Sequence, residues 1–537
     1  MIDTNSVTGK LVDPIGRSII NAKIYIQDGV ISRIEEIEDV GNVYIIPGFV
    51  DSHVHIESSL LIPTRFAQAA IKNGTVAVVA DPHEVANVAG VEGVRFMIEN
   101  AKLSNLKFFF GAPSCVPASP VDECFEPFTY KEVAKLLSLP EVTHLAEMMN
   151  FPGVIHGNTD VYSILNEAKK RNKPIDGHAP GLSGENLSKY VSAGITTDHE
   201  CFTLEEAKLK IELGMKVLIR EGSAAKNFNA LHPLIGLNPK MVMFCTDDCH
   251  PDELVGGHIN KHVRKAIALG YDIFDVLQVA SVNPVNHYRL NVGLLQVGQP
   301  ADFIVVDNLK DFNVLSTFIE GVNVINFGND FSVNAPSFSF PDHFDRNKIR
   351  LDFHSGKPVK VIKVIEGELI TDTLNTEVPS NGYDFDKDIL KIVVLSRYNP
   401  NNMGVGLIHG FGIRKGAIAA SIAHDSHHIV AIGADDDSIV RAIDYIIRSR
   451  GGICYYNGSK ILGLTLPYFG LMTDVDVSHA AKDYSFINEK LKADGCGLHA
   501  PFMTMAFMSL SVIPHLKLTP AGLFDVDRFC LTSLFAE

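Results

Sequence analysis

Two histidines separated by one residue are the first feature of the sequence that could carry chemistry. His53 and His55 lie in the segment DSHVHIE at residues 51–57, at the end of an apolar run. In a β-strand, side chains at positions i and i+2 point to the same face, so both rings can offer a nitrogen to one metal ion. A single pair of this kind is weak evidence, because buried histidines are more often satisfied by hydrogen bonds alone.

Four other apolar runs end in a residue that can bind a metal ion. Glu147 ends one run, His178 and His199 end two more, and Asp247 ends the last. Chance could place one such residue at the end of a strand, but a full set at the ends of five strands predicts a metal centre. Asp248 is the alternative to Asp247 if the register of that strand is shifted by one residue.

The number of candidate ligands exceeds what one catalytic ion needs. A four-coordinate catalytic ion usually has three protein ligands and keeps one position for water. Six candidates therefore predict two ions, with a carboxylate that bridges them. The predicted arrangement has His53 and His55 on one ion, His178 and His199 on the other, Glu147 between the two, and Asp247 beside a bridging hydroxide.

The elements that must position these residues are short strands that alternate with helical segments from Phe49 onward. This rhythm over about 250 residues is typical of an α/β fold of the (β/α)₈ TIM-barrel type, whose active site lies at the carboxyl ends of the strands. An open doubly wound sheet is the alternative, but it would carry a GxGxxG loop, which is absent here. The predicted strands are residues 49–55, 75–80, 107–111, 142–149, 174–177, 195–198, 216–220 and 241–246.

The segments on both sides of the predicted barrel are β-like. Short strands with turns fill residues 11–46, and strand-like segments return after Pro284. We predict a small composite β-sandwich domain from residues 1–48 and 296–345, a metal-binding barrel from residues 49–295, and an additional α/β C-terminal domain from residues 346–537.

The composition is that of an ordinary globular protein. The chain has 537 residues, with 47 Lys and Arg against 63 Asp and Glu, and a formal net charge of −16. This acidity argues against binding to nucleic acid or to anionic membranes, which requires clustered positive charge. The eight cysteines include no CxxC pair, and the first residues lack the order of a signal peptide. We therefore expect a cytoplasmic protein, in which the apolar segment 501–514 is a buried helix or contact surface.

Several stretches resemble the amidohydrolase superfamily and, within it, the adenine deaminase family. The superfamily resemblance rests on PGFVDSHVH at residues 47–55, the later single histidines and Asp247. The finer resemblance is carried by longer stretches in the barrel and continues into the C-terminal part. These stretches are HVHIESS at 53–59, ADPHEVAN at 80–87, AEMMNFPG at 146–153, GHAPG at 177–181, CTDDCHPD at 245–252, AHDSHHIV at 423–430 and LTLPYFGLM at 464–472.

The resemblance implies hydrolytic deamination of adenine to hypoxanthine and ammonia by a metal-bound hydroxide, in purine salvage. It implies two divalent metal ions, with Mn²⁺ or Fe²⁺ preferred to Zn²⁺, although imidazole and carboxylate ligands suit all three. Asp247 would accept a proton from the attacking water and deliver it to the leaving amine. The expected partners are adenine and water, without nucleic acid or membrane, and we expect a homo-oligomer.

A second acid must protonate the ring nitrogen beside the attacked carbon. Mononuclear nucleoside deaminases of the superfamily supply it from an HxxE motif, but the sequence here reads HAPG at residues 178–181. Glu57, which would extend the strand face of His53 and His55, and Glu84 are equal candidates. Further candidates for contact with the substrate are Ser58, Ser59 and His83.

Two other functions compete with this interpretation. A binuclear amidohydrolase that cleaves a small amide, of the deacetylase or dipeptidase type, would have the same metal chemistry but would not release ammonia from adenine. A non-catalytic assembly protein on the same barrel would have lost metal ligands, whereas all six positions hold competent residues. The polar cluster at residues 424–428 suits a loop or domain interface better than a further metal site.

Overall fold

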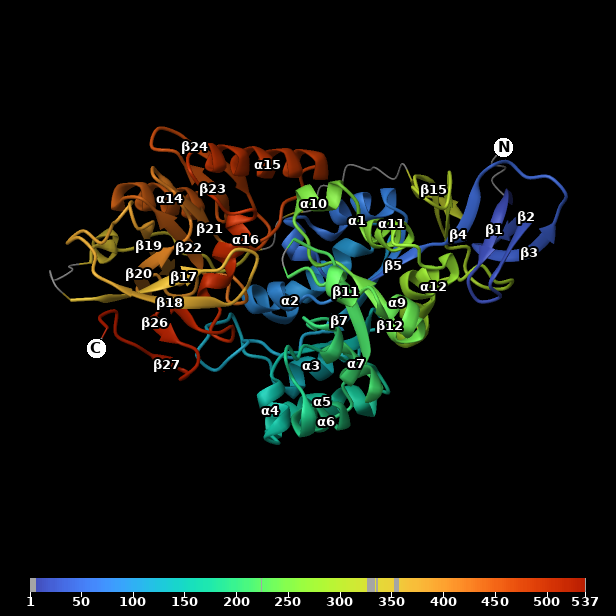
Figure 1. Cartoon of the computed structure of the whole chain (residues 1–537), viewed down its shortest axis with the longest axis horizontal. Coiled ribbons are helices and arrows are strands. Elements are labelled where there is room, and N and C mark those ends of the chain that lie inside the picture. Colours follow the sequence, from blue (N-terminus) through green and yellow to red (C-terminus); the bar gives the residue numbers. More distant parts are fainter. Residues whose placement is uncertain (1–5, 224, 326–333, 335–336, 352–356, 537) are drawn as a thin grey trace.

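The computed structural model describes residues 6–223, 225–325, 334, 337–351 and 357–536. These residues form a small sheet near the N-terminus, a central barrel and a large C-terminal region, arranged along the long axis of the molecule (Figure 1). Parts of the predicted composite and C-terminal domains, residues 1–5, 326–333, 335–336, 352–356 and 537, lie outside the described residues. No helix within the described ranges is long and apolar enough to cross a membrane.

Strands from both sides of the barrel sequence share one sheet. Within the described residues these strands are β1 (Ser6–Asp13), β2 (Ser18–Gln27), β3 (Val30–Glu36), β4 (Tyr44–Pro47), β14 (Phe303–Val306), β15 (Val314–Ile319) and β16 (Val322–Asn323). Their order is β16-β15-β14-β4-β1-β2-β3. β4 joins the two halves, since it pairs in parallel with β1 and antiparallel with β14. Inward side chains such as Ile24 and Phe303 form a separate core, as strand alternation requires.

The central part of the described chain is a barrel of eight parallel strands, which confirms the predicted fold. The strands are β5 (Phe49–His55), β6 (Thr75–Ala80), β7 (Lys107–Ala112), β8 (Val142–Met148), β9 (Ile175–Gly177), β10 (Thr197–Asp198), β11 (Lys216–Arg220) and β12 (Val242–Cys245). The barrel closes where β13 (Asp247–Asp248), which continues β12, pairs in parallel with β5. Between β9 and β10, the Thr196 amide donates a hydrogen bond to the Ile175 carbonyl at 2.9 Å.

Helices cover the outside of the barrel, and their first residues explain where they begin. Pro63 opens α1 with a fixed φ, and Thr129 and Glu132 form a reciprocal capping box at the start of α3. The helices are α1 (Pro63–Lys72), α2 (His83–Ala101), α3 (Tyr130–Leu137), α4 (Phe151–Ile155), α5 (Thr159–Lys170), α6 (Gly184–Ser192), α7 (Leu204–Glu212), α8 (Phe228–Leu231), α9 (Leu234–Leu237), α10 (Pro251–Val255), α11 (Ile259–Ala268), α12 (Ile273–Leu277) and α13 (Asn283–Tyr288).

The C-terminal region is built on a mixed sheet of order β18-β17-β20-β19-β22-β21-β23-β24, with a small antiparallel sheet of β25, β26 and β27 beside it. The strands are β17 (Val359–Val364), β18 (Thr371–Thr376), β19 (Ile389–Leu395), β20 (Met403–His409), β21 (Ala417–Ala420), β22 (Ile429–Gly433), β23 (Gly452–Tyr456), β24 (Ile461–Thr465), β25 (Leu516–Thr519), β26 (Gly522–Asp525) and β27 (Cys530–Leu531). The helices are α14 (Asp436–Arg448), α15 (Val477–Ala493) and α16 (Pro501–Ala506). The buried side chains of α16 confirm the prediction of a buried helix in the segment 501–514.

The C-terminal region is hydrogen-bonded to the barrel beside the carboxyl end of β5. The Thr473 amide donates to the Leu60 carbonyl at 2.8 Å, and the Ile62 amide donates to the Thr473 carbonyl at 3.1 Å. Arg65, from α1, donates to the Asp474 carbonyl at 2.6 Å. In Figure 1, α2 and α10 of the barrel lie on the side that faces the C-terminal region. The C-terminal region therefore covers the end of the barrel where an active site is expected.

Candidate active site

The predicted metal ligands from β5 and β13 meet at the carboxyl end of the barrel. The Nε2 atoms of His53 and His55 are 3.1 Å apart. Asp247 places Oδ1 at 3.3 Å from His53 Nε2 and at 3.1 Å from His55 Nε2. Glu147, from β8, places Oε1 at 3.4 Å from His55 Nε2. All four side chains are buried, so these atoms form one compact donor group.

A second pair of histidines faces the other oxygen of the same glutamate. Glu147 Oε2 lies 2.7 Å from His178 Nδ1 and 3.3 Å from His199 Nε2. His199 also stacks on His53, with ring centroids 4.1 Å apart, which brings the two groups together. Glu147 thus directs one oxygen to each group, which is the arrangement expected of a carboxylate that bridges two cations.

The chemistry of this donor set fits divalent metal ions. His55 Nδ1 lies 3.1 Å from the Asp81 carbonyl, which can only accept, so Nδ1 carries the proton and Nε2 keeps its lone pair. Ligand atoms about 2.1 Å from a shared ion lie about 3.0–3.5 Å from each other. The separations of 3.1–3.4 Å among His53, His55 and the two carboxylates match this spacing.

The two central carboxylates are held in the ionised form that metal ligation requires. Burial opposes the charge on Glu147, but the charge of His178 and hydrogen bonds to His178 and His199 lower the pKa of this carboxyl well below its usual value. Burial also opposes the charge on Asp247, and the pKa of Asp247 is nevertheless lowered well below its usual value by Arg220 and by His53 and His55.

The backbone at the end of the eighth strand decides which of two neighbouring aspartates faces the ligands. Asp247 has a φ of 55°, a left-handed conformation that aspartate tolerates better than most residues. Its side chain turns toward His53, whereas Asp248 accepts a hydrogen bond from Ser58 Oγ at 2.5 Å. The structure therefore brings Asp247, and not Asp248, to the other candidate ligands.

Arg220 is a buried residue beside the ligands that is not among the site residues predicted from the sequence. Arg220, the last residue of β11, contacts both Glu200 and Asp247 through Nη1. Burial opposes the charge of Arg220, but Glu200 and Asp247 raise its pKa, so it stays a cation. Glu200 Oε1 lies 3.4 Å from His199 Nε2 and is itself a possible metal ligand. Two sequence features could have identified these residues. Arg220 ends a predicted strand, and Glu200 directly follows His199.

Replacement of Arg220 by methionine should lower kcat about 10²-fold and the melting temperature by several degrees. The variant leaves Glu200 and Asp247 buried without their cation, which typically costs about 3–5 kcal/mol, and Asp247 loses the contact that orients it. Steady-state kinetics and thermal unfolding measure both effects. The control is Arg95→Met, because Arg95 is exposed and lies 3.6 Å from Glu92 in a surface ion pair. Equal losses in the two variants would refute the assigned role.

Glu57 is buried but does not extend the face of His53 and His55, so this part of the sequence prediction is wrong. β5 ends at His55, and Ile56–Ser59 form a 3₁₀ turn that redirects the side chain. Glu57 Oε1 accepts a hydrogen bond from the Val85 amide at 3.1 Å, while Oε2 has no hydrogen-bond partner among the described residues. Burial raises the pKa of Glu57 to about 7.

Glu84, at the start of α2, has different surroundings. Its Oε1 lies 2.5 Å from His424 Nδ1, and its Oε2 contacts His427 Nε2. Burial opposes its charge, but these two histidines lower the pKa of Glu84 well below its usual value. The polar cluster predicted to be a loop or interface thus contacts the barrel.

The three predicted substrate contacts take different positions. His83 Nδ1 lies 3.3 Å from Asp81 Oδ1 and 3.6 Å from Glu147 Oε1, at the edge of the ligand cluster. Ser58 bonds to Asp248 and also lines a pocket. Ser59 Oγ donates to the Ile56 carbonyl at 2.6 Å, so its hydroxyl serves the local turn.

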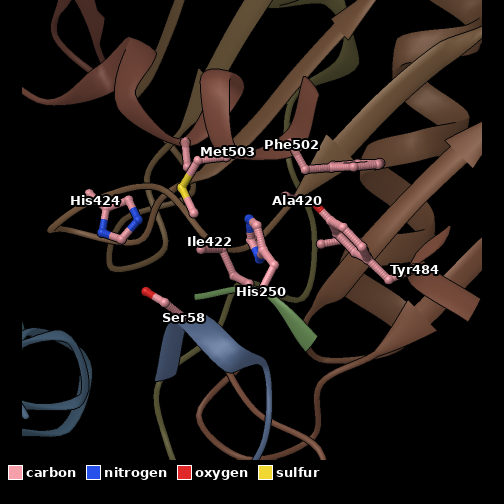
Figure 2. A pocket seen from close by; sticks show the side chains of 10 residues that line it. Ser58, His250, Ala420, Ile422, His424, Tyr484, Phe502 and Met503 are labelled. Atoms are coloured by element: carbon pink, nitrogen blue, oxygen red, sulfur yellow. The ribbon is translucent and has the colours of Figure 1, made fainter. Parts of the chain in front are cut away.

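This pocket lies between the barrel and the C-terminal region (Figure 2). The ring of His250 stacks on Tyr484 with centroids 4.9 Å apart, and neither of its ring nitrogens has a hydrogen-bond partner among the described residues. The free space in the pocket is about 10 Å³, close to the volume needed for one water molecule, and it is bounded by apolar walls and these ring nitrogens of His250. Its lining residues are Ser58, His250, Ala420, Ile422, His424, Ile453, Tyr484, Phe502, Met503 and Ala506.

Comparison with known proteins agrees with the fold. Residues 44–324 match the Amidohydrolase family, and residues 368–530 match the Adenine deaminase C-terminal domain. The adenine deaminase of Methanosarcina mazei is 49% identical over 98% of this chain and 99% of its own length. The adenine deaminase of Sulfurovum sp. is 48% identical over 96% of this chain and 97% of its own length. That of Borreliella burgdorferi is 43% identical over 98% of this chain and 99% of its own length.

The barrel and the match over more than half of the chain define a member of the amidohydrolase family, a class for which the buried histidine and carboxylate groups indicate divalent metal binding. Within that class, the match to the C-terminal domain and the similarity over the full length of the chain indicate the same family. The chain belongs to the adenine deaminase family. The resemblance inferred from the sequence is thereby confirmed, and the amide-cleaving alternative is not favoured.

Proposed function

We propose that this chain catalyses the hydrolytic deamination of adenine to hypoxanthine and ammonia. The substrate follows from the named relatives, which cover nearly the whole chain. The observation that carries the chemistry is the position of Glu147, which directs one carboxylate oxygen to each of two histidine groups. We further propose purine salvage, a cytoplasmic location, homo-oligomers and the three-domain division given above.

The proposed cofactor is a pair of divalent ions, Mn²⁺ or Fe²⁺ in preference to Zn²⁺. Such ions lower the pKa of water, so that a nucleophile is available near neutral pH. The tautomer of His55 and the ionised carboxylates support this assignment. The proposed ligands are His53, His55, Glu147, His178, His199 and Asp247.

Asp247 is the proposed carrier of the proton from water to the leaving amine. Arg220 holds Oδ2, while Oδ1 faces His53 and His55. A carboxylate fixed in this way can accept the proton as the water attacks C6 and then release it to the amino group, which departs as ammonia. Glu200 also contacts Arg220, but it faces His178 and His199 in place of His53 and His55.

Glu57 is the proposed acid for the ring nitrogen. Both oxygens of Glu84 contact histidines in ion pairs, whereas Glu57 Oε2 is buried with neither an ion pair nor a hydrogen bond among the described residues. A free oxygen is available to the substrate, and one that is already paired is not. The structure thus supports a choice that the sequence left open.

The two glutamates should affect different kinetic constants. We expect Glu57→Gln to lower kcat about 10²-fold with little change in KM, since the amide cannot supply a proton. Glu84→Gln should instead raise KM, because it loosens the contact with His424 and His427. Initial rates over a range of adenine concentrations measure both constants, and metal content per chain is the control. The reverse pattern, at equal metal content, would exchange the two roles.

Ammonia release from adenine tests the proposed function directly. The apo-protein is reconstituted with Mn²⁺, Fe²⁺ or Zn²⁺, and bound metal is counted per chain. Activity should saturate near two ions. Metal uptake without ammonia release would reject the substrate and redirect the search to small amides, while a failure to bind metal would reject the ligand set.

A further inference from the structure

A loop of the C-terminal region, residues 421–428 between β21 and β22, is held rigidly over the barrel. Arg397 is fully buried, and its guanidinium donates hydrogen bonds to three main-chain carbonyls. Nε donates to His427 at 2.7 Å, Nη2 to Ser421 at 3.1 Å and Nη1 to Phe469 at 2.6 Å. Burial of a cation without a paired carboxylate is costly, and the three carbonyls and the ring of Phe340, 5.1 Å from Arg397 Cζ, offset this cost, so the conformation of this loop is closely fixed.

The same loop is attached to the barrel beside the ligand cluster. His427 Nδ1 accepts a hydrogen bond from the Ala423 amide, so a neutral ring carries its proton on Nε2, which faces Glu84. His424 contacts the other oxygen of Glu84 and stacks on Phe507 with ring centroids 4.4 Å apart. Because Glu84 follows His83 in the chain, one of the two residues between His424 and His427 is brought near His83.

That residue is Asp425, and its carboxylate is not satisfied by the protein. The side chain is 5% exposed, and Oδ2 has no hydrogen-bond partner among the described residues. Within the described ranges Asp425 forms an ion pair with His83, whose Nε2 lies 3.9 Å from Oδ1, too far for a hydrogen bond. A buried carboxylate oxygen without a hydrogen-bond partner is costly and calls for an explanation. A bound ligand that supplies a donor would provide one.

The position of Asp425 suits the far edge of a bound purine. His83 directs Nδ1 to Glu147 at 3.6 Å and Nε2 to Asp425 at 3.9 Å, so Asp425 and the metal ligands lie on opposite sides of one aromatic ring. A planar bicyclic ligand whose C6 is at the ligand cluster extends over a similar distance. His424, adjacent to Asp425, is also in the wall of the pocket, where the apolar side chains of Ile422 and Phe502 lie (Figure 2).

We propose that Asp425 contacts the substrate by accepting a hydrogen bond from the imidazole N–H of adenine, so that the C-terminal region completes the active site. This inference rests on the proposed function. Free adenine carries one N–H in its imidazole half, on N9 or N7, whereas a nucleoside has its sugar on N9 and carries none. The carboxylate therefore selects the free base, because an acceptor that loses its donor is left buried and unpaired.

The contact is tested from both sides with the metal-loaded full-length protein. Asp425→Asn should raise the KM for adenine and the Kd for hypoxanthine about 10- to 100-fold, as expected for loss of one hydrogen bond to a charged group. 9-Methylhypoxanthine lacks the imidazole N–H and should bind the wild type at least about tenfold more weakly than hypoxanthine. In Asp425→Asn this preference should become smaller, because the neutral amide oxygen is a weaker acceptor than the carboxylate, whereas a purely steric effect of the methyl group would persist unchanged.

Asp437→Asn is the matched control, since Asp437 is exposed in the first turn of α14 and should leave both ligands and the metal content unchanged. If Asp425→Asn does not fold, Asp425→Ser and the wild-type comparison of the two hypoxanthines still test the contact. Equal binding of hypoxanthine by wild type and variant, or an unchanged preference over the methylated ligand, would overturn the proposal. If wild type binds hypoxanthine with this preference but releases no ammonia from adenine, the proposed function fails and the contact stands.

Discussion

Asp247→Asn should lower kcat for adenine deamination by at least about 10³-fold. The amide cannot accept a proton from water or return one to the amine, so both proton transfers lose their carrier. The side chain keeps nearly the same shape, and its position should be retained through contacts with Arg220 and His55. We therefore expect folding to be preserved and metal content to fall by less than half, while turnover is nearly abolished. Single-turnover rates and metal counts on the same samples measure these effects.

Asp248→Asn is the control for this experiment. Asp248 has the same functional group one residue further along, but it contacts Ser58 and not the histidines. We expect a change in kcat of less than about tenfold, because the lost contact is a single hydrogen bond outside the ligand cluster. If Asp248→Asn had the larger effect at unchanged metal content, the proton carrier would be Asp248 and the role of Asp247 would be limited to metal binding.

The sequence was sufficient to predict the barrel because each strand carries its own local signal. Apolar runs such as Phe49–His55 and Lys216–Arg220 begin and end in the structure where the sequence pattern places them. In a closed parallel barrel all strand ends meet at one rim, so side chains at those ends converge without any knowledge of long-range contacts. This is why residues as distant in sequence as His53 and Asp247 could be grouped in advance.

Other parts of the site depend on information that a local pattern does not contain. Glu57 was assigned to the strand face, but the chain turns directly after His55, and strand alternation does not extend past the end of a strand. The approach of Asp425 to His83 joins segments more than 300 residues apart and follows from how the C-terminal region docks on the barrel. Arg220 lies at the end of a predicted strand, but a local pattern does not indicate that a cation at this position supports a metal ligand such as Asp247.

The docked C-terminal region also explains why Glu57 and Glu84, two buried glutamates of the barrel, have separate roles. Glu84 is committed to His424 and His427 and joins the two parts of the chain. Burial and the nearby charge of Glu84 raise the pKa of Glu57 and that of Asp425 to about 7, because a buried site disfavours further negative charge. The free oxygens of Glu57 and Asp425 are then available to a ligand from two directions, one from the barrel and one from the C-terminal region.

Glu147→Gln should have the largest effect of all on metal content. Both oxygens of Glu147 face histidines, and an amide offers one weak oxygen ligand in place of two charged ones. Loss of one carboxylate also leaves the remaining histidines with less negative charge to offset two divalent ions. We expect fewer than one ion per chain after dialysis and a loss of kcat of at least about 10³-fold. Elemental analysis and ammonia release measure the two effects.

Glu141→Gln isolates the effect of the bridging position from that of removing a glutamate near the same strand. Glu141 directly precedes β8 and pairs with Lys102 at 2.8 Å near the surface, so its loss should cost at most about 1 kcal/mol and leave the metal content unchanged. If Glu147→Gln retained two ions, the two histidine groups would have to bind them independently. Full activity in that variant would mean that the reaction does not depend on the carboxylate of Glu147. This carboxylate links His55, through Oε1, to His178 and His199, through Oε2.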